Sequence, residues 1–518
     1  MAQPAPYYPS QAPFYDWVAH HAARAPAKLA LVDLATDRRL SYADLHDRAD
    51  RLAHHLRSVL GLARGDRVAM LSQNCTEFFE VEFATARGGL IMLPLNWRLT
   101  VHELGFIIGD AAPKVLIYDT TFAETAEQLR KECGIPHLVA LQSGNLACDY
   151  EKALAGSPPG FVAERAIHDD PCMVMYTSGT TGLPKGALIT HGMQFWNCAN
   201  LSFPARITRR AVCLTVLPLF HTGGLNCYAN PMLHAGATVL VARAFDPGEA
   251  LRLIGDAAVG VTHFFGVPTM YQVMRDHPRF HETDFSRIHC SGVGAAPMPL
   301  GVLRDWADKG LALSQGYGMT ETSPTTLVLD PEDAVRKAGS AGRPALHTEV
   351  RVVGEEGQDV APGVVGELWT RGPNITPGYW NRPDANATSF TDGWLHTGDA
   401  ATVDEEGFVT IVDRWKDMYI SGGENVYPAE VENAIADMPE VAEAGVIGVA
   451  HEKWGEVGKA FVVLRPGREL TADAVLAQCR ARLARFKQPV YVEFIAALPR
   501  NAAGKILKRE LKTRPHEI

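Results

Sequence analysis

Short runs of β-branched and other apolar residues alternate along most of this chain with stretches that have helical periodicity. The strand-like run 66–71 precedes an amphipathic stretch at 77–87, and the run 114–118 precedes another at 121–132. The alternation recurs around residues 238–256. Strands that alternate with helices in this way build layered α/β folds with largely parallel sheets. The sequence therefore predicts an α/β fold, and it contains no fixed internal repeat.

The pattern of expected elements changes near residue 340, where short strand-like runs follow one another without helices between them. These runs lie at 349–353, 366–370 and 407–412, and turn residues separate them. The pattern predicts a β-rich subdomain over about 340–412. We expect it to complete a large N-terminal domain of layered α/β subdomains over 1–412.

A polar segment with charges of both signs, 413–417, interrupts the chain after the last of these runs. A new alternation of strand and helix patterns then continues to the end, and roughly 100 residues are enough for a compact domain. We therefore expect a hinge at 413–417 and a small, mobile α+β lid domain over 418–518.

Composition excludes several classes of protein. The 518 residues are 47% hydrophobic and 21% charged, as in ordinary folded proteins of two or more domains. The net charge of -10 and pI near 6.0 argue against nucleic acid as a partner, because binding to its phosphate backbone requires a basic excess. Nine cysteines without a CxxC pair indicate neither a zinc site nor a disulfide framework. With no secretory signal in residues 1–17, this predicts a cytoplasmic protein.

Residues 211–242 contain no Asp, Glu, Lys or Arg, which is long enough to raise the question of a membrane span. Histidines, asparagines, prolines and glycines interrupt the stretch, and a lipid-facing helix tolerates these poorly. We interpret it as core strands and helices around a largely apolar pocket, not as a span.

A loop rich in glycine and hydroxyl groups lies at 176–186, with the sequence YTSGTTGLPKG. Its glycines let the backbone approach a ligand closely, its hydroxyls supply hydrogen-bond donors, and Lys185 adds a mobile positive charge. These features suit a polyphosphate. The loop is not a P-loop, because Leu183 and Pro184 separate Gly182 from Lys185. A flexible surface turn is the alternative interpretation of the loop on its own.

Further segments form an ordered series with this loop. They are PLFH at 218–221, GAAP at 294–297, QGYGMTE at 315–321, WLHTGD at 394–399, DRWKD at 413–417, SGGENVYP at 421–428 and PRNAAGK at 499–505. In this order they resemble the adenylate-forming superfamily, which contains acyl-CoA synthetases, luciferase and the adenylation domains of peptide synthetases. The likeness is greatest to bacterial fatty-acyl or aryl carboxylate:CoA ligases.

The resemblance implies an AMP-forming acid:CoA ligase that uses ATP, Mg2+ and CoA. A carboxylate is a poor electrophile, so its oxygen attacks the α-phosphorus of ATP to give an acyl-adenylate and pyrophosphate. The CoA thiol then displaces AMP. Two anions meet in the first step, which explains the need for cations and backbone donors. The implied partners are a small carboxylic acid and CoA, and a homodimer is the default for an enzyme of this size.

The resemblance also implies roles in nucleotide binding. The loop residues and Lys185 would hold the β- and γ-phosphates, the GAAP and QGY segments would form the adenine slot, Thr320 would contact the α-phosphate, and Glu321 would bind Mg2+. Asp399 and Arg414 would contact the ribose, and Lys505 would bridge the carboxylate and the α-phosphate. The residues for ATP are Thr177, Ser178, Gly179, Thr180, Thr181, Gly182, Lys185, Gly294, Ala295, Ala296, Gln315, Gly316, Tyr317, Gly318, Met319, Thr320, Asp399, Arg414 and Lys505.

Each of the main assignments has a structural alternative. Glu321 is also explained as a carboxylate at a helix start, Asp399 as a turn residue, and Tyr317 as core packing. Lys505 is also explained as a surface charge among other basic residues.

For the second half-reaction, the resemblance implies rotation of the C-terminal domain about Lys416. Gly423 would then line the pantetheine tunnel, and Trp454, Phe486 and Lys487 would support CoA.

The resemblance assigns the acyl pocket to two apolar regions, the uncharged stretch 211–242 and residues 262–270, together with Ala295. Its residues are His221, Thr222, Gly223, Gly224, Phe265, Val267, Met270 and Ala295. His221 resembles the gate beside the reacting carboxylate, and a core histidine is the alternative. Both regions are apolar, which predicts an aliphatic or aromatic acid.

The choice between fatty and aryl acids stays open, because Ala295 resembles the coumarate ligases whereas 336–343 and 500–508 resemble the fatty-acyl ligases. Amino-acid activation is a poor second choice, because 211–242 offers no acid to pair with a substrate amine. A luciferase-like oxygenase is a further alternative.

Overall fold

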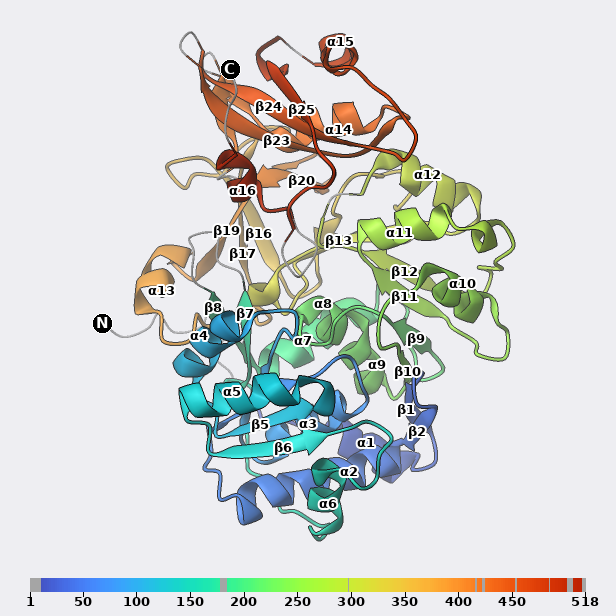
Figure 1. Ribbon diagram of the computed structural model, residues 1–518, viewed down its shortest axis with the longest axis vertical. Coiled ribbons are helices and arrows are strands. Elements are labelled where there is room, and N and C mark those ends of the chain that lie inside the picture. Colours follow the sequence, from blue (N-terminus) through green and yellow to red (C-terminus); the bar gives the residue numbers. More distant parts are fainter. Residues whose placement is uncertain are drawn as a thin grey trace.

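The computed structural model describes residues 11–177, 184–296, 298–414, 417–421, 424–451, 454–483, 485–500 and 506–514. The strands in these residues form four sheets. In Figure 1 the earlier part of the chain fills the lower and middle regions, and the C-terminal sheet lies at the top. The expected α/β fold, with a large N-terminal part and a smaller C-terminal part, is confirmed.

The first sheet has six strands in the order β6-β5-β3-β4-β7-β8. All neighbours are parallel except β7 and β8, which form an antiparallel hairpin that pairs Thr177 with Lys185. The hairpin therefore fixes both ends of the glycine-rich loop. The strands are β3 (Arg67–Leu71), β4 (Ile91–Pro94), β5 (Val115–Asp119), β6 (His137–Leu141), β7 (Pro171–Thr177) and β8 (Lys185–Thr190); the associated helices are α3 (Glu77–Arg87), α4 (Val101–Ala111), α5 (Ala123–Cys133) and α6 (Asp149–Ala155).

The second sheet has nine strands in the order β15-β14-β13-β12-β11-β9-β10-β1-β2. The run from β13 to β1 is parallel throughout, so these strands end at the same edge of the sheet. The strands are β1 (Leu29–Asp33), β2 (Arg38–Ser41), β9 (Val212–Thr215), β10 (Thr238–Val241), β11 (His263–Gly266), β12 (Cys290–Val293), β13 (Leu313–Tyr317), β14 (Leu327–Val328) and β15 (Arg343–Pro344). Its helices include α7 (His191–Ser202), α10 (Pro247–Gly255), α11 (Pro268–Arg275) and α12 (Leu300–Asp308), and α1 (Trp17–Arg24) and α2 (Tyr42–His54) precede or follow β1 and β2.

The uncharged stretch 211–242 forms core strands and helices, as expected. Strand β9 leads into one short helical run made of α8 (Thr222–Gly224), the π-helical turn η3 (Leu225–Ala229) and α9 (Asn230–Ala235), and β10 follows. Within the described residues, no helix has the length and apolar character needed to cross a membrane.

The third sheet is antiparallel, and its strands lie between residues 349 and 414. Its strands are β16 (Glu349–Val353), β17 (Gly366–Arg371), β18 (Phe390–Thr391), β19 (Trp394–Val403) and β20 (Val409–Arg414), with α13 (Pro383–Ser389) before β18. Strand β20 runs through Arg414, which pairs in register with Asp399 of β19. The first two residues of the segment predicted as a hinge therefore belong to a strand.

The C-terminal sheet has the order β22-β21-β24-β23, with β25 beside β24. Its elements are β21 (Tyr419–Ser421), β22 (Glu424–Val426), α14 (Pro428–Ala436), β23 (Val441–His451), β24 (Gly455–Leu464), α15 (Ala472–Arg482), the 3-10 turn η6 (Arg485–Lys487), β25 (Tyr491–Phe494) and α16 (Lys508–Lys512). It has hydrophobic clusters of its own, one of them built around Tyr419, Val431 and Phe486. Arg465 approaches Asp276, just after α11, at 3.9 Å.

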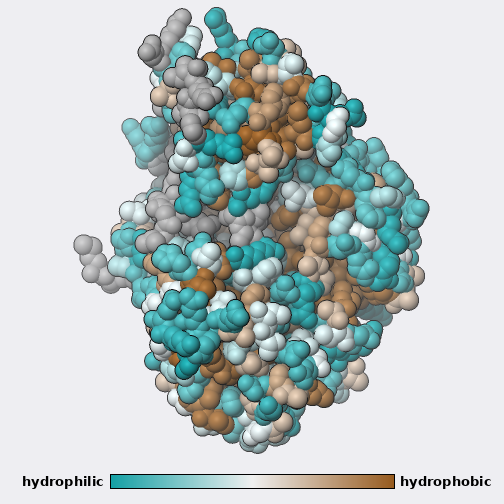
Figure 2. Space-filling model, in the orientation of Figure 1, coloured by the Kyte–Doolittle hydropathy of each residue, from teal (hydrophilic) through white to brown (hydrophobic). Residues whose placement is uncertain are grey.

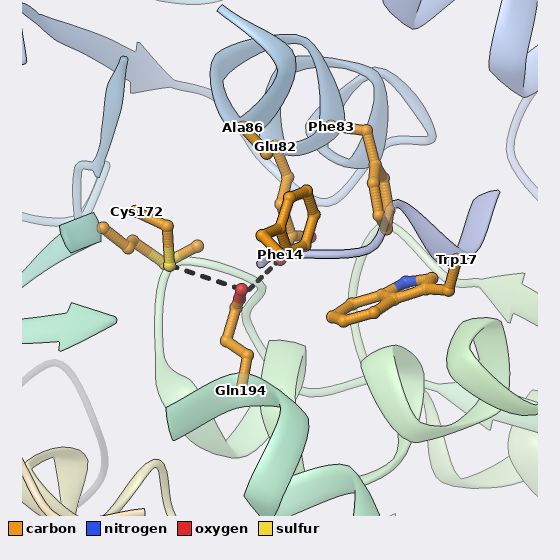
Figure 3. Close-up of a pocket in the computed structure, with 8 residues that line it drawn as sticks. Phe14, Trp17, Glu82, Phe83, Ala86, Cys172 and Gln194 are labelled. Carbon is orange, nitrogen blue, oxygen red and sulfur yellow. Dashed lines mark hydrogen bonds between the residues drawn. The ribbon is translucent and has the colours of Figure 1, made fainter. Parts of the chain in front are cut away.

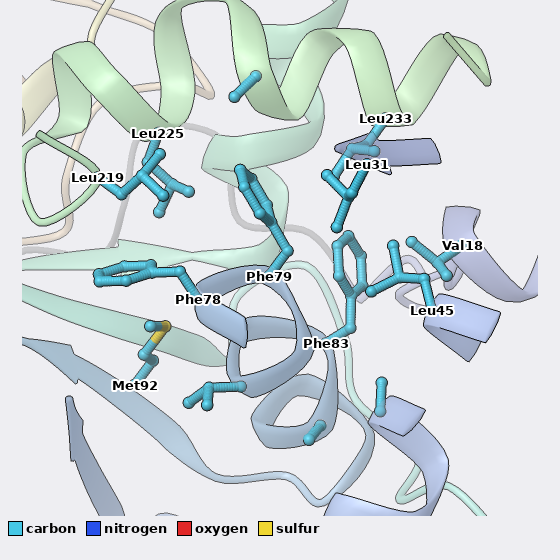
Figure 4. Close-up of a cluster of buried hydrophobic side chains, with 14 of the residues drawn as sticks. Val18, Leu31, Leu45, Phe78, Phe79, Phe83, Met92, Leu219, Leu225 and Leu233 are labelled. Carbon is cyan, nitrogen blue, oxygen red and sulfur yellow. The ribbon is translucent and has the colours of Figure 1, made fainter. Parts of the chain in front are cut away.

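Helix α3 joins the two N-terminal sheets through one hydrophobic core. Every residue of α3 is buried. Figure 4 shows Phe78, Phe79 and Phe83 of this helix among Leu225 and Leu233 of the 222–235 run. A fully buried phenylalanine stabilises a fold by about 1.5–3 kcal/mol relative to an exposed one. The aromatic face of α3 therefore supplies a large share of the contact between the sheets.

The same helix buries two glutamates whose charge is compensated. Arg38 lies 2.5 Å from Glu77 and 2.7 Å from Glu80, and Arg48 lies 2.9 Å from Glu80. Tyr150 also donates a hydrogen bond to Glu80 at 2.9 Å. Burial alone would raise the pKa of Glu80, but the two arginines outweigh it and hold the pKa below its ordinary value. The cluster therefore ties β2 and α2 to α3 by charge.

Replacing Arg38 with Met should destabilise the protein strongly, because Glu77 would lose its nearest cation. Removing one partner of a buried ion pair costs about 3–5 kcal/mol, to be measured by urea unfolding at pH 7. Arg39→Met is the matched control. Its pair with Asp37 has side chains 62% and 82% exposed, so the change should stay below about 1 kcal/mol. Equal losses in the two variants would contradict the assignment.

Candidate active site

Four neighbouring parallel strands bring the predicted site residues to one edge of the nine-stranded sheet. Glu321 follows β13, Gly294 follows β12, Val267 follows β11 and His221 lies shortly after β9. Parallel α/β sheets bind ligands at the carboxyl ends of their strands. The topology therefore gathers segments that are far apart in the sequence.

A tyrosine that the sequence analysis missed lies between Lys185 and Glu321. The Nζ of Lys185 is 5.1 Å from the centroid of the Tyr379 ring. The Tyr379 hydroxyl donates a hydrogen bond of 2.7 Å to Oε1 of Glu321. An isolated bridge between Tyr379 and Ala187 fixes this position on β8. In sequence Tyr379 ends an ordinary Thr-Pro-Gly-Tyr turn, so no local signal distinguishes it.

Glu321 is held in a tight segment. It lies in the 3-10 turn η5 (Thr320–Thr322) and is 5% exposed. The backbone N–H of Thr376 donates to its carbonyl at 2.7 Å. A Cβ at Gly318 would lie only 1.5 Å from the carbonyl oxygen of Pro324, so glycine is required there. Thr320 and Met319 beside it are partly exposed.

Tyr317 and Asp399 also meet. The Tyr317 hydroxyl donates a hydrogen bond to Oδ2 of Asp399, which is 5% exposed on β19. Asp399 pairs in register with Arg414. A buried carboxylate therefore lies between the end of β13 and the end of β20, the two regions assigned to adenine and ribose.

The remaining residues of the GAAP and QGY segments differ in their environments. Ala295 and Ala296 are exposed, and Ala295 has φ of +71°. Gln315 is buried, and its side-chain amide donates to the carbonyl of Ser340 at 2.9 Å. Gly316 is partly exposed. The backbone of these segments is available to a ligand, whereas the Gln315 side chain is committed to the protein.

An aromatic wall follows the ends of β11 and β12. The ring centroids of Phe265 and Tyr228 are 5.5 Å apart, and the two ring planes meet at 66°. A Cβ at Gly292 would lie 2.6 Å from Cδ2 of Phe265 and 2.6 Å from the Tyr228 hydroxyl, and one at Gly294 would lie 3.2 Å from Cζ of Phe265. The Phe265 ring therefore lies against a glycine strand that leaves space for it.

His221 lies at the start of the 222–235 helical run. Burial, reinforced by the nearby charge of Arg98, lowers the pKa of His221 to about 4. Its Nε2 is buried and has no hydrogen-bond partner among the described residues. A Cβ at Gly224 would come within 2.2 Å of the Pro218 carbonyl oxygen, so this helix start lies directly on the PLFH turn. His221 is therefore a neutral imidazole in an apolar place.

The other residues assigned to the acyl pocket lie in different environments. Thr222 is buried and Gly223 is partly exposed. Val267 precedes α11 as its capping residue, and Met270 packs against the hydrophobic cluster behind β11. The structure thus brings His221, Thr222 and Phe265 to the same sheet edge and turns Met270 toward the core.

Several predicted residues lie outside the described part of the chain: 178–183, Lys416, Gly423 and Lys505, together with the Arg414 side chain. Of the residues assigned to CoA, Trp454 is 39% exposed. Phe486 packs in the C-terminal core, and Lys487 pairs with Glu430 at 2.6 Å. On the face shown in Figure 2, hydrophobic surface gathers over the C-terminal sheet. Val490 and Phe494 in this part of the chain are exposed.

Comparison with known proteins places these features in one family. The profile of the AMP-binding enzyme family matches residues 18–380, and the profile of the AMP-binding enzyme C-terminal domain matches 430–505. Together they cover the sheet edge, the glycine-rich loop and strands β23, β24 and β25 of the C-terminal sheet.

Curated relatives match over almost their whole length. The chain is 44% identical to a feruloyl-CoA synthase of Amycolatopsis over 92% of this chain and 94% of the relative. It is 39% identical to the indoleacetate–CoA ligase of Aromatoleum aromaticum (96% and 97%) and 38% identical to a long-chain-fatty-acid–CoA ligase of Mycobacterium tuberculosis (94% and 95%). All three are acid–CoA ligases by name, and none is an oxygenase or an amino-acid-activating enzyme.

Solved structures agree. ATP-bound MatB from Rhodopseudomonas palustris superimposes with a TM-score of 0.89 at 35% identity, covering 96% of this chain and 97% of that one. The o-succinylbenzoate CoA synthetase of Bacillus subtilis with its acyl-adenylate intermediate gives 0.86 at 33% identity, covering 98% and 99%. The resemblance found in the sequence is therefore confirmed, and the chain belongs to the AMP-binding enzyme family, the adenylate-forming enzymes.

Proposed function

We propose that this chain, an AMP-forming acid–CoA ligase, activates an aromatic acid that carries its carboxylate on a short side chain. The observation that carries this proposal is the aromatic wall, where Phe265 lies against Gly292 and Gly294 beside Tyr228. Aromatic rings pack favourably at such edges. An arylpropenoic or arylacetic acid has a flat ring to place there and a carboxylate to extend toward the nucleotide.

The relatives support the same class. Those at 44% and 39% identity are named for feruloyl-CoA and indoleacetate, and both acids are aromatic. The relative at 38% identity is named for long-chain fatty acids, so fatty acids are the competing class. Ala295, which resembles the coumarate ligases, supports the aromatic choice.

On the nucleotide side, we assign the β- and γ-phosphates to Thr177, Lys185 and the loop between them. Thr320 would contact the α-phosphate. Tyr317, Asp399 and Arg414 would hold adenosine, with Asp399 accepting hydrogen bonds from the ribose hydroxyls. Lys505 would neutralise charge as the carboxylate oxygen bonds to phosphorus and pyrophosphate leaves.

Glu321 suits a magnesium ion that accompanies ATP. It is a buried carboxylate, and the Tyr379 hydroxyl occupies only its Oε1. Oxygen ligands of this kind are what Mg2+ prefers. When bound, the ion would offset negative charge on the phosphates. Independently of the ion, the Tyr379 hydroxyl holds Glu321 and the Lys185 ammonium lies over the Tyr379 ring, so both groups would face the same phosphates.

The C-terminal part would serve the second half-reaction. We propose that residues 418–518 form a lid that turns about Lys416, so that Gly423 replaces Lys505 at the adenylate and Trp454, Phe486 and Lys487 face CoA. The thiol sulfur then bonds to the acyl carbon, and the bond to AMP breaks. The nine free cysteines fit a reducing compartment, and on that ground we place the enzyme in the cytoplasm.

The acid preference can be tested by CoA-dependent AMP release with hydroxycinnamates, arylacetates, benzoates and saturated fatty acids at equal concentration. The best aromatic acid should exceed every fatty acid in kcat/KM by about tenfold or more, the discrimination that a shaped apolar pocket typically achieves. Preference for a long-chain fatty acid would overturn the proposed substrate class.

The wall itself can be tested with Gly292→Ala. The new methyl would displace Phe265 or Tyr228, so kcat/KM should fall about tenfold for the aromatic acid and less for a short aliphatic acid. Gly301→Ala is the control, because a Cβ there has no neighbour within 4 Å. A uniform loss across all acids would argue against a wall that selects the ring.

Tyr379→Phe should weaken the use of Mg2+, because Glu321 loses the hydroxyl that orients it. Losing such an outer contact typically costs 10-fold or more in metal affinity, and we expect about a tenfold higher Mg2+ requirement in acid-dependent ATP–pyrophosphate exchange. Tyr150→Phe is the matched control, since it removes a tyrosine–glutamate hydrogen bond of 2.9 Å in the core. An unchanged Mg2+ requirement in Tyr379→Phe would refute the assignment.

His221 should remain neutral in the folded enzyme at physiological pH. Its pKa of about 4 lies below the ordinary value of 6.5. Its contribution to stability is therefore complete above pH 6.5 and is lost as the pH falls toward 4. NMR of protein labelled at histidine nitrogen, compared with His221→Gln, should show one resonance that does not titrate between pH 5 and 8. Titration near pH 6.5 would contradict this prediction.

A further inference from the structure

Helix α3 carries a third buried glutamate on a side away from the ion cluster. Glu82 is 5% exposed. Glu77 and Glu80 pair with Arg38, whereas the described residues include no ion pair for Glu82. Figure 3 shows its carboxyl group beside a small cavity with the rings of Phe14, Trp17 and Phe83 around it. A carboxyl group in such a place must be retained by hydrogen bonds.

Two side-chain amides supply these hydrogen bonds. Nε2 of Gln194 donates to Oε1 of Glu82 at 2.8 Å, and Nδ2 of Asn230 donates to the same oxygen at 2.7 Å. The Cys172 thiol donates to Oε1 of Gln194 at 3.3 Å and so fixes the orientation of that amide. One oxygen of Glu82 therefore links α3 to α7 and α9, and Gln194 extends the network to β7.

The network continues along the helical run toward the acyl site. The same Nδ2 of Asn230 donates to Oδ1 of Asn226 at 2.8 Å, and Nδ2 of Asn226 donates to Oγ1 of Thr222 at 3.2 Å. Residues 222, 226 and 230 are spaced four apart, so they share one face of a helix. Thr222 immediately follows His221.

The helical run needs such a restraint. Its middle is the π-helical turn η3, and π turns are short, irregular and frequent at functional sites. Asn197 of α7 also donates to the carbonyl of Asn226 at 2.7 Å. Side-chain hydrogen bonds thus hold the turn from both sides.

We propose that Glu82 is a positioning residue for the acyl site, and that it sets the position of Thr222 and His221 through Asn230 and Asn226. This rests on the proposed function only in naming the segment 221–224 as part of the acyl site. The role requires an acceptor for two amide donors at position 82. Without that acceptor, two buried N–H groups would have no partner, which is costly.

The charge on Glu82 changes near neutral pH. Burial raises the pKa of Glu82 to about 7, although the hydrogen bonds from Asn230 and Gln194 oppose the shift. The titratable groups that face it are the thiols of Cys172 on β7 and Cys198 on α7, whose pKa values are raised by burial and by Glu82 itself. The neutral carboxyl is favoured in the fold, so stability from this group is lost as the pH rises through about 7.

Two variants separate the hydrogen bonds from the charge. Glu82→Gln keeps an oxygen that accepts from both amides and removes the titration, whereas Glu82→Leu keeps much of the volume and removes the acceptor. Glu80→Gln is the control, because it alters a buried glutamate of the same helix within the ion cluster. Stability loss alone would affect the Glu80 and Glu82 variants alike.

The first measurement is amide hydrogen exchange of residues 222–235 without substrate. Glu82→Leu should exchange about tenfold faster in this segment, as expected when the partner of a buried hydrogen bond is lost. Glu82→Gln and Glu80→Gln should stay near wild type there. Unchanged exchange in Glu82→Leu, or equal acceleration in Glu80→Gln, would overturn the proposal. This result is independent of which acid the enzyme uses.

The second measurement is steady-state kinetics with the best acid of the panel. Glu82→Leu should raise KM for the acid about tenfold and change KM for ATP less than about twofold, the effect expected for one lost buried contact. In wild type, kcat/KM for the acid should vary with an ionisation near pH 7 that Glu82→Gln lacks. If Glu82→Leu does not fold, this pH comparison decides, and identical pH profiles would overturn the proposal.

Discussion

The burial of helix α3 between the two N-terminal sheets is the constraint on which the rest of this structure depends. Its three phenylalanines fill the space between the sheets. Glu77 and Glu80 of the same helix pair with arginines from β2 and α2. Both sheets therefore pack against the same helix. The glycine-rich loop belongs to one sheet and the edge that carries Glu321, Gly294 and His221 belongs to the other. A rigid connection between the two sheets would hold the proposed phosphate and acid sites in register.

Much of the fold could be predicted from the sequence, because hydrophobic periodicity and turn residues are local features of the chain. The expected helix at 77–87 coincides with α3, the strand-like run at 349–353 coincides with β16, and the run at 114–118 overlaps β5. The segment 413–417, which stays a predicted hinge, overlaps a strand. Residues 413 and 414 are polar but complete β20, because pairing with β19 satisfies their backbone. Tertiary pairing there outweighs local composition.

The site could be predicted only where a residue stands in a recognisable segment. Lys185, Glu321, Tyr317 and Asp399 do, and the structure brings them together in two pairs. Tyr379 joins the first pair through a bridge to β8, a contact between residues almost 200 positions apart. Glu82 and Asn230 are similarly separated in sequence. Their positions follow from packing, which single-residue patterns do not contain.

The nucleotide site and the acid site of such an enzyme depend on different kinds of contact, so substitutions affect the two specificities differently. Transfer of the adenylyl group needs cations, carboxylates and flexible backbone at fixed places around ATP, so these groups stand in compact segments at strand ends. Recognition of an apolar acid needs only shape and a neutral surface, and we propose that the wall of Phe265 and Tyr228 and the imidazole of His221 supply them. Shape is set by contacts such as Gly292 against Phe265 and by the hydrogen bonds that hold the 222–235 run. Substitutions at these supporting contacts can alter the acid that is accepted while leaving the nucleotide site intact. This is consistent with relatives that are named for an aromatic and for a fatty acid at nearly the same identity to this chain.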